Sequence, residues 1–105
     1  MASLNSYFVT SYTNSTWTNL RTTTSKSMIL CVSATNTTSG TITCEIRITD
    51  SGGTEKFRLL PPVGITGKNN ISTSDKIVIP SGYKIDIKAS DAGMTFMLSL
   101  AEDLS

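Results

Sequence analysis

The segment Thr41-Ile42-Thr43-Cys44-Glu45-Ile46-Arg47-Ile48-Thr49 decides the fold class, because polar and apolar side chains alternate along its whole length. Successive side chains of a β-strand point to opposite faces, so the even-numbered residues from Ile42 to Ile48 are predicted to share one buried face. Residues 83–89 and 94–100 repeat this period. Their predicted inward side chains are Tyr83, Ile85, Ile87, Ala89, Met94, Phe96, Leu98 and Leu100. No segment shows the apolar period of about 3.6 residues that is typical of a helix, so the sequence predicts an all-β protein.

Weaker strand patterns lie between these three runs. They cover residues 7–13, 16–21, 27–34, 55–60 and 76–79. Proline cannot donate a ladder hydrogen bond, so the strand before Pro61-Pro62 must end there or lie at the edge of a sheet. Residues suited to tight turns separate the runs at 36–40, 50–53, 67–70, 80–82 and 91–93. About seven or eight short, mostly antiparallel strands predict a β-sandwich, either Ig-like or jelly-roll-like.

The length of 105 residues suits one domain, so we expect residues 1–105 to form a single β-sandwich. Residues 1–6 and the tail after Leu100 are expected to be irregular. The N-terminal segment 1–15 is expected to serve as an interaction arm. Asp50-Ser51-Gly52-Gly53 tolerates positive φ and is a good signal for a hairpin between the strands on either side.

The composition excludes several kinds of partner. Charged residues make up only 16% of the chain, whereas 17 Thr and 15 Ser give it an uncharged polar character. The net charge is +1 and the nine basic residues are scattered, so we expect no nucleic-acid binding. The longest apolar stretches, Met28–Val32 and Ile77–Ile79, are too short to span a membrane. The N-terminus does not resemble a secretory signal, which favours synthesis and use in a cytoplasm.

Two cysteines, Cys31 and Cys44, raise the question of a disulfide. If residues 27–34 and 41–49 pair as a hairpin, these two residues lie opposite each other on neighbouring strands. Such strand pairs fit disulfide geometry poorly, and no export signal indicates an oxidising compartment. We therefore expect two small, buried and reduced side chains rather than a disulfide.

The sequence contains no histidine, and this excludes the commonest general base and the commonest metal ligand together. No phosphate-binding loop, dinucleotide-binding turn or CxxC pair is present. We therefore expect no enzymatic activity, no cofactor and no metal site. Glu45 and Asp86 lie on the polar faces of well-patterned strands, where a solvated surface position is expected.

Aromatic residues concentrate near the N-terminus, outside the strongest alternation. They are Tyr7, Phe8, Tyr12 and Trp17. One interpretation buries them in the chain's own small core. The other makes them an anchor for a partner, because Trp and Tyr are enriched at protein interfaces.

A set of turns and strands resembles a known family. The sequence has Ala34-Thr35-Asn36-Thr37 at the end of one strand, Leu59-Leu60-Pro61-Pro62-Val63 in another, and Ala89-Ser90-Asp91-Ala92-Gly93 before the last. From about Trp17 to Leu104 the chain resembles small β-sandwich accessory proteins from the virions of tailed bacteriophages. Family members often have Gly-Asp where this chain has Gly82-Tyr83.

The resemblance implies a non-enzymatic virion component that is assembled in the host cytoplasm. A capsid decoration or cement protein is the first expectation, with the major capsid protein as partner and a homo-oligomer, such as a trimer, as the form. A neck, tail or fibre-associated protein is the second. A carbohydrate-binding β-sandwich module is the alternative from another class, and it would need Trp17, Tyr12 and Tyr83 exposed on one surface.

Overall fold

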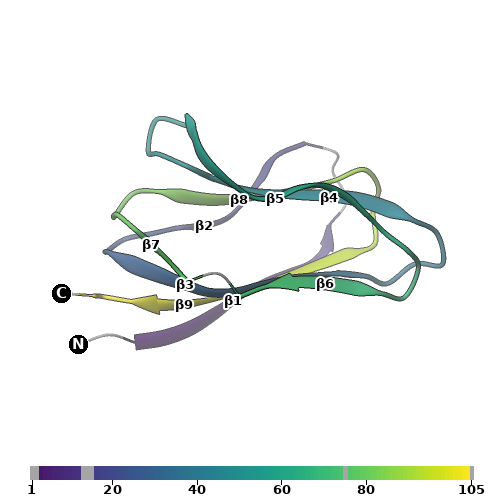
Figure 1. Ribbon diagram of the computed structural model, residues 1–105, viewed down its shortest axis with the longest axis horizontal. Helices are drawn as coiled ribbons and strands as arrows, with labels where there is room; N and C mark the ends of the chain where they lie inside the picture. Colours follow the sequence, from purple (N-terminus) through teal and green to yellow (C-terminus); the bar gives the residue numbers. More distant parts are fainter. Residues whose placement is uncertain (1–2, 13–15, 75, 105) are drawn as a thin grey trace.

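The computed structural model describes residues 3–12, 16–74 and 76–104, with residues 10–12 described by their backbone alone. Within these ranges, nine β-strands pack as two antiparallel sheets, which confirms the all-β sandwich (Figure 1). The strands are β1 (Ser3–Tyr12), β2 (Thr18–Thr22), β3 (Ser27–Asn36), β4 (Ile42–Thr49), β5 (Glu55–Ile65), β6 (Asn70–Thr73), β7 (Ile77–Ile79), β8 (Lys84–Ala89) and β9 (Met94–Glu102).

The strand order is that of a jelly roll. Sheet 1 has the order β1-β9-β3-β6, with β7 also paired to β3, and sheet 2 has the order β2-β8-β4-β5. The pairs are nested: β4 with β5, β3 with β6 and β7, β2 with β8, and β1 with β9. The chain is therefore one long hairpin, with its bend between β4 and β5, rolled into two sheets. This arrangement decides between the two predicted sandwich types in favour of the jelly roll.

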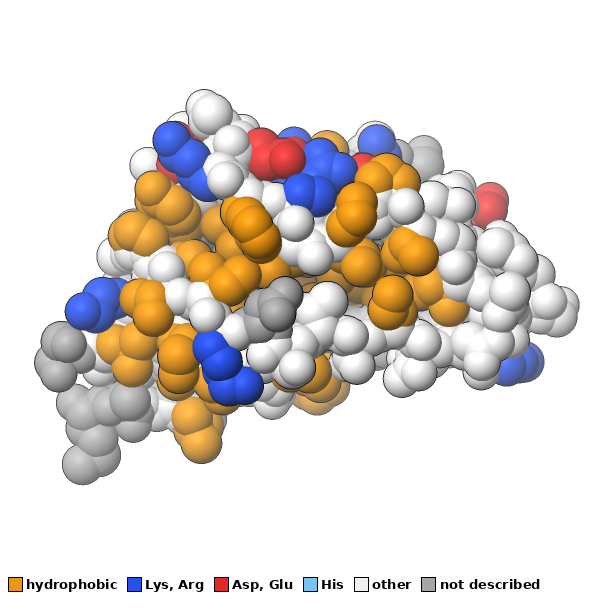
Figure 2. Space-filling view, in the orientation of Figure 1, with side chains coloured by type: hydrophobic (Ala, Val, Ile, Leu, Met, Phe, Trp, Pro, Cys, Tyr) orange, Lys and Arg blue, Asp and Glu red, His pale blue; other side chains and the backbone are white. Residues whose placement is uncertain are grey.

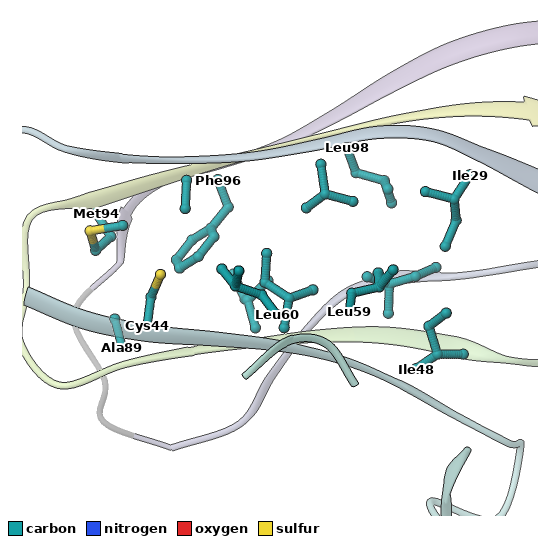
Figure 3. Packing of buried hydrophobic residues seen from close by; sticks show 14 of the residues in the cluster. Ile29, Cys44, Ile48, Leu59, Leu60, Ala89, Met94, Phe96 and Leu98 are labelled. Carbon is teal, nitrogen blue, oxygen red and sulfur yellow. The ribbon is translucent and has the colours of Figure 1, made fainter. Parts of the chain in front are cut away.

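The core lies between the inner faces of the two sheets (Figure 3). Phe96 of sheet 1 and Ile46 of sheet 2 are 0% and 1% exposed, and every even-numbered residue of β4 from Ile42 to Ile48 is buried. The predicted inward residues of β8 and β9 are buried too, except that Tyr83, just before β8, is only partly buried. Two-residue alternation therefore identified the inner faces correctly.

Strand β3 changes its inward set halfway along. In its first half the odd-numbered residues, such as Ile29, are buried. In its second half the even-numbered residues, such as Val32 and Ala34, are buried, and Leu30 and Cys31 between the two halves are both half-buried. The pairing with β9 shifts between Ile29 and Cys31, which marks a β-bulge. The extra residue moves the inward set from odd to even positions, and this explains why the segment is apolar on both faces.

Strand β5 continues through Pro61-Pro62 and lies at the edge of sheet 2. The edge position needs no donor on its outer side, so the prolines are tolerated there. The turn into β5 forms the predicted hairpin. Oδ1 of Asp50 accepts hydrogen bonds from the backbone N–H groups of Gly52 and Thr54, each at 3.0 Å. Gly53 has a φ of 90°, a value that favours glycine.

Three expectations about element boundaries were wrong. Strand β1 begins at Ser3, so residues 3–6 are not irregular, and β9 continues through Ala101 and Glu102. Residues 70–73 form β6, a strand that was not predicted because residues 67–70 are typical of a turn. All three segments gain their order from strands far away in the sequence: β1 pairs with β9, and β6 pairs with β3. Residues 1 and 2 lie outside the described ranges.

Strands β3 and β4 do not pair as a hairpin, because they belong to different sheets. The buried Asn36 organises the crossing: its Nδ2 donates to the carbonyl oxygens of Gly40 at 2.6 Å and Ile65 at 2.9 Å. Its Oδ1 accepts from the N–H of Thr38 at 2.9 Å. Cys31 and Cys44 are consequently on separate sheets, and both are free thiols. Cys44 is buried and Cys31 is half-buried.

Truncation of a buried core residue should destabilise the fold strongly. Phe96→Ala should lower the free energy of unfolding by about 3–5 kcal/mol, because it leaves a cavity between the sheets. Phe57→Ala is a matched control, since Phe57 is 50% exposed and should cost less than about 1 kcal/mol. Chemical denaturation followed by circular dichroism measures both. Equal losses for the two variants would contradict the burial of Phe96 between the sheets.

Candidate interaction surfaces

Charged residues are segregated between the two sheets. The strands of sheet 1 contain one charged side chain, Glu102, and it points inward and is 5% exposed. Every other charged residue in a strand belongs to sheet 2. These are Arg21, Glu45, Arg47, Glu55, Lys56, Arg58, Lys84, Asp86 and Lys88. The two outer faces of the sandwich therefore differ in chemistry.

The outer face of sheet 1 is uncharged. Cross-strand pairing places Leu4 beside Ala101 and Phe8 beside Met97, and it places Met97 beside Ser33. The face consists of Leu4, Ser6, Phe8, Met28, Cys31, Ser33, Thr35, Asn70, Ser72, Val78, Thr95, Met97, Ser99 and Ala101. We call it the uncharged face. Its hydroxyls bond to each other rather than to charges, as in the 3.2 Å contact between the Oγ atoms of Ser6 and Ser99.

The outer face of sheet 2 is a network of ion pairs that we call the charged face. Arg58 contacts Glu45 and Glu55, each at 2.6 Å. Arg47 contacts Asp86 at 3.3 Å, and Asp86 also accepts from Nδ2 of Asn19 at 3.3 Å. Asp86 is 8% exposed, so the expectation that it is solvated was wrong. Glu45 is half-buried in the same network. The charges of this face are thus largely neutralised by one another.

Trp17 lies on the charged face, where basic side chains cover it. The guanidinium carbon of Arg47 is 4.2 Å from the ring centroid, and that of Arg58 is 5.1 Å away. The Nζ of Lys88 is 5.5 Å away. Such cation–π contacts hold the ring against the sheet. The half-buried Trp17 is therefore part of the ion-pair network.

A polar cluster around the buried Glu102 closes the side of the sandwich between β1 and β2. Glu102 accepts from Nδ2 of Asn5 at 2.8 Å and from the hydroxyl of Tyr7, and it contacts Arg21 of sheet 2 at 2.8 Å. The guanidinium of Arg21 also lies 4.4 Å from the Tyr7 ring centroid. Burial raises the pKa of Glu102, but the hydrogen bonds from Tyr7, Arg21 and Asn5 outweigh it and hold the pKa below its usual value. The bond to Glu102 raises the pKa of Tyr7.

The four predicted partner-binding residues do not form one patch. Tyr7 points inward into the Glu102 cluster, whereas its neighbour Phe8 points outward and is 63% exposed. Trp17 belongs to the charged face. The side chain of Tyr12 lies outside the described residues. Sequence reasoning missed Leu4, which is 76% exposed and lies on the same face of β1 as Phe8. Alternation extended back to Ser3 would have found it.

Apolar side chains also gather along the side of the sandwich between β5 and the strands β6 and β7, as Figure 2 shows. Phe57 of β5 is 50% exposed, and Pro61 and Pro62 of the same strand are exposed as well. Ile71 and Ile77 are only partly buried and pack against the core. This side is a continuation of the core that the two sheets do not fully cover.

Within the described ranges, no three His, Cys, Asp or Glu residues are grouped so that they could hold a metal ion. The described part of the chain also has no helix long and apolar enough to cross a membrane. Burial raises the pKa of the Cys44 thiol to about 11, and the Glu45 carboxylate adds to the effect. That thiol is therefore protonated at neutral pH and acts as a small apolar side chain.

Comparisons with known proteins identify the fold but no family. No protein-family model matches the sequence, and no curated protein matches it. A structure from Bacillus endospore appendages, described as disulfide-linked pili, aligns with a TM-score of 0.57 and 12% identity. The alignment covers 100% of this chain and 92% of that one. The globular domain of zebrafish complement 1qA aligns with a TM-score of 0.52 and 7% identity, over 99% of this chain and 98% of that one.

Viral particles are also among the structural neighbours. VP2 from the subviral particle of infectious bursal disease virus aligns with a TM-score of 0.51 and 14% identity over 96% of this chain. This chain spans 32% of the length of that VP2 chain. The neighbours differ in function and their identities are low, so they show a shared fold and nothing more.

The cations of the charged face should differ in how much they stabilise the fold. Arg47→Ala should lower the free energy of unfolding by about 1–3 kcal/mol, because it leaves the buried Asp86 without its cationic partner. Lys88→Ala should change it by less than about 0.5 kcal/mol, since the 4.0 Å contact from Lys88 to Glu45 is partly exposed. Urea denaturation followed by circular dichroism distinguishes them. Equal effects would mean that the Arg47–Asp86 pair is not structural.

Glu102 should make the stability of the fold depend on pH. Its folded-state pKa lies below the ordinary 4.5, so the unfolded chain takes up the proton first as the pH falls. The stability from Glu102 is therefore full above about pH 5 and is lost as the pH falls through the folded-state pKa. Glu102→Gln should be less stable at pH 7 and should lose less stability between pH 5 and pH 2, in melts at a series of pH values. Asp91→Asn, in an exposed turn, should retain the acid dependence of the unmodified protein.

Proposed function

We propose that this chain is a non-enzymatic structural protein of a virus particle, and within that class a capsid decoration or cement protein of a tailed bacteriophage. The jelly roll is an architecture used by viral capsid proteins, among others. The likeness to VP2 agrees with this at the level of the fold. The resemblance in turns and strands to tailed-phage accessory proteins supplies the more specific role.

The observation that carries the proposal is the uncharged face of sheet 1. A solvent-exposed sheet face usually bears charged residues. In this chain the charged strand residues belong to sheet 2, apart from the inward-pointing Glu102. Protein interfaces exclude charge from their centre, because a buried unpaired charge is costly. Three strands of 9 or 10 residues, together with the short β6 and β7 beside β3, give a face on the order of 600 Å² at about 4.8 Å between strands. A standard interface buries about 800 Å² per partner, so the face is of suitable size.

The major capsid protein is the proposed first partner. A decoration protein docks on a shell that is already assembled and adds contacts across its subunits, so a broad, flat and uncharged surface suits it. Assembly takes place in the host cytoplasm, and the final location is the virion. A neck, tail or fibre position would use the same surface and is the second choice.

Carbohydrate binding has less support from the geometry. A sugar platform needs exposed rings on one surface. Trp17 is half-buried and covered by Arg47, and Tyr83 packs against the core. The third ring, that of Tyr12, lies outside the described residues.

Co-sedimentation with expanded, undecorated heads tests the proposal. The purified protein should pellet with heads of the phage that encodes it and should saturate at a fixed number of copies. Met97→Lys puts a charge in the centre of the uncharged face and should weaken binding at least tenfold. Thr43→Lys puts the same charge on the exposed outer side of sheet 2 and should leave binding unchanged.

Thermal melts of both variants show whether they fold. Binding to purified tails but not to heads would move the protein to the neck or tail. Binding to neither would overturn the virion assignment. Equal loss in the two lysine variants would overturn the choice of face.

A further inference from the structure

We propose that two copies of this chain pair edge to edge through β1, antiparallel and centred on Ser6, so that the two copies of sheet 1 become one continuous sheet. The inference deepens the proposed function, because it assigns the surface through which the subunit self-associates. It rests on a comparison of the sheet edges and on the two most exposed large hydrophobic residues among those described.

Three of the four sheet edges carry features that discourage pairing with another chain. Strand β5 has two prolines and charged residues, and its pairing with β4 shifts at three places. Strand β2 is five residues long and its pairing with β8 is shifted. The β6 and β7 edge consists of strands of four and three residues. These edges are short, interrupted or blocked.

The β1 edge is longer and less interrupted, because its one shift in pairing with β9 lies near its end, between Val9 and Tyr12. The strand is 10 residues long and contains no proline, glycine or charged residue. From Ser3 to Val9 its pairing with β9 is unbroken, so this stretch is regular. The inward side chains Asn5 and Tyr7 are held by Glu102, which keeps the strand in place. A regular edge presents a row of backbone donors and acceptors that a further strand can satisfy.

The outward side chains indicate which strand that is. Leu4 and Phe8 are 76% and 63% exposed, and they lie at equal distances from Ser6 along the strand. When two copies of β1 pair antiparallel about Ser6, Leu4 of each copy lies opposite Phe8 of the other, on the same face. Directly opposite side chains in an antiparallel pair are in contact. The pairing therefore forms two Leu4–Phe8 contacts, one on each side of the two-fold axis. No like charges face each other, because β1 contains no charged residue.

The pairing also extends the uncharged face. Leu4 and Phe8 belong to that face, so joining two copies at β1 doubles its width without a break. The resulting assembly has two-fold symmetry, a dimer rather than the trimer implied by the family resemblance.

Two double variants test the proposal with matched substitutions. Leu4→Lys with Phe8→Lys places like charges opposite each other at both contacts. Leu4→Lys with Phe8→Glu places opposite charges there. Sedimentation velocity over a range of concentrations should show a dimer for the unmodified protein and for the Lys/Glu variant. The Lys/Lys variant should have a dissociation constant at least about tenfold higher. Circular dichroism melts confirm that each variant folds.

Each other outcome overturns the proposal. A monomeric or trimeric unmodified protein excludes the two-fold pairing. A dimer equally stable in both double variants places the interface elsewhere, and loss of the dimer in both excludes the register about Ser6. The assay uses purified protein without heads, so its result is independent of whether the protein binds a virus particle.

Discussion

The two inner sheet faces pack against each other, and this packing limits which surfaces the chain can offer to other molecules. Each strand has only two faces, and the residues from Ile42 to Ile48 and from Met94 to Leu100 that point inward are already used by the core. Any contact with another molecule must then use an outer face, an edge or a loop. The division of charge between sheets 1 and 2 matters for this reason, because it makes the two outer faces chemically different.

The Glu102 cluster shows how sheet 1 stays uncharged on its outside. The one charged side chain of its strands is turned inward and neutralised by Arg21 from the other sheet. A buried pair of this kind contributes little net stability, but removing one partner is costly. The pair also spans the two sheets beside β1. It therefore positions the strand whose free edge and outward hydrophobic residues carry the proposed self-association.

How much could be predicted from the sequence depended on whether the signal was local. Alternation over residues 41–49 identified a buried face correctly. Pro61-Pro62 left two possibilities, a strand end or an edge strand, and the structure has the edge strand, which continues to Ile65. Nested pairing was beyond local patterns: β3 and β4 look like a hairpin, yet Asn36 directs the chain across to the other sheet. Asp86 looked solvated because only the folded structure brings Arg47 and Asn19 beside it. The aromatic residues near the N-terminus were noticed as a group, but the two faces of β1 separate Tyr7 from Phe8.

We propose that the chain acts by contact through the uncharged face of sheet 1. Oxidative footprinting of the protein alone and on phage heads tests it most directly, because Met28 and Met97 lie on that face and Trp17 lies on the opposite one. Both methionines should become protected on the particle, while the reactivity of Trp17 should be unchanged. Protection of Trp17 with no change at Met28 and Met97 would contradict it.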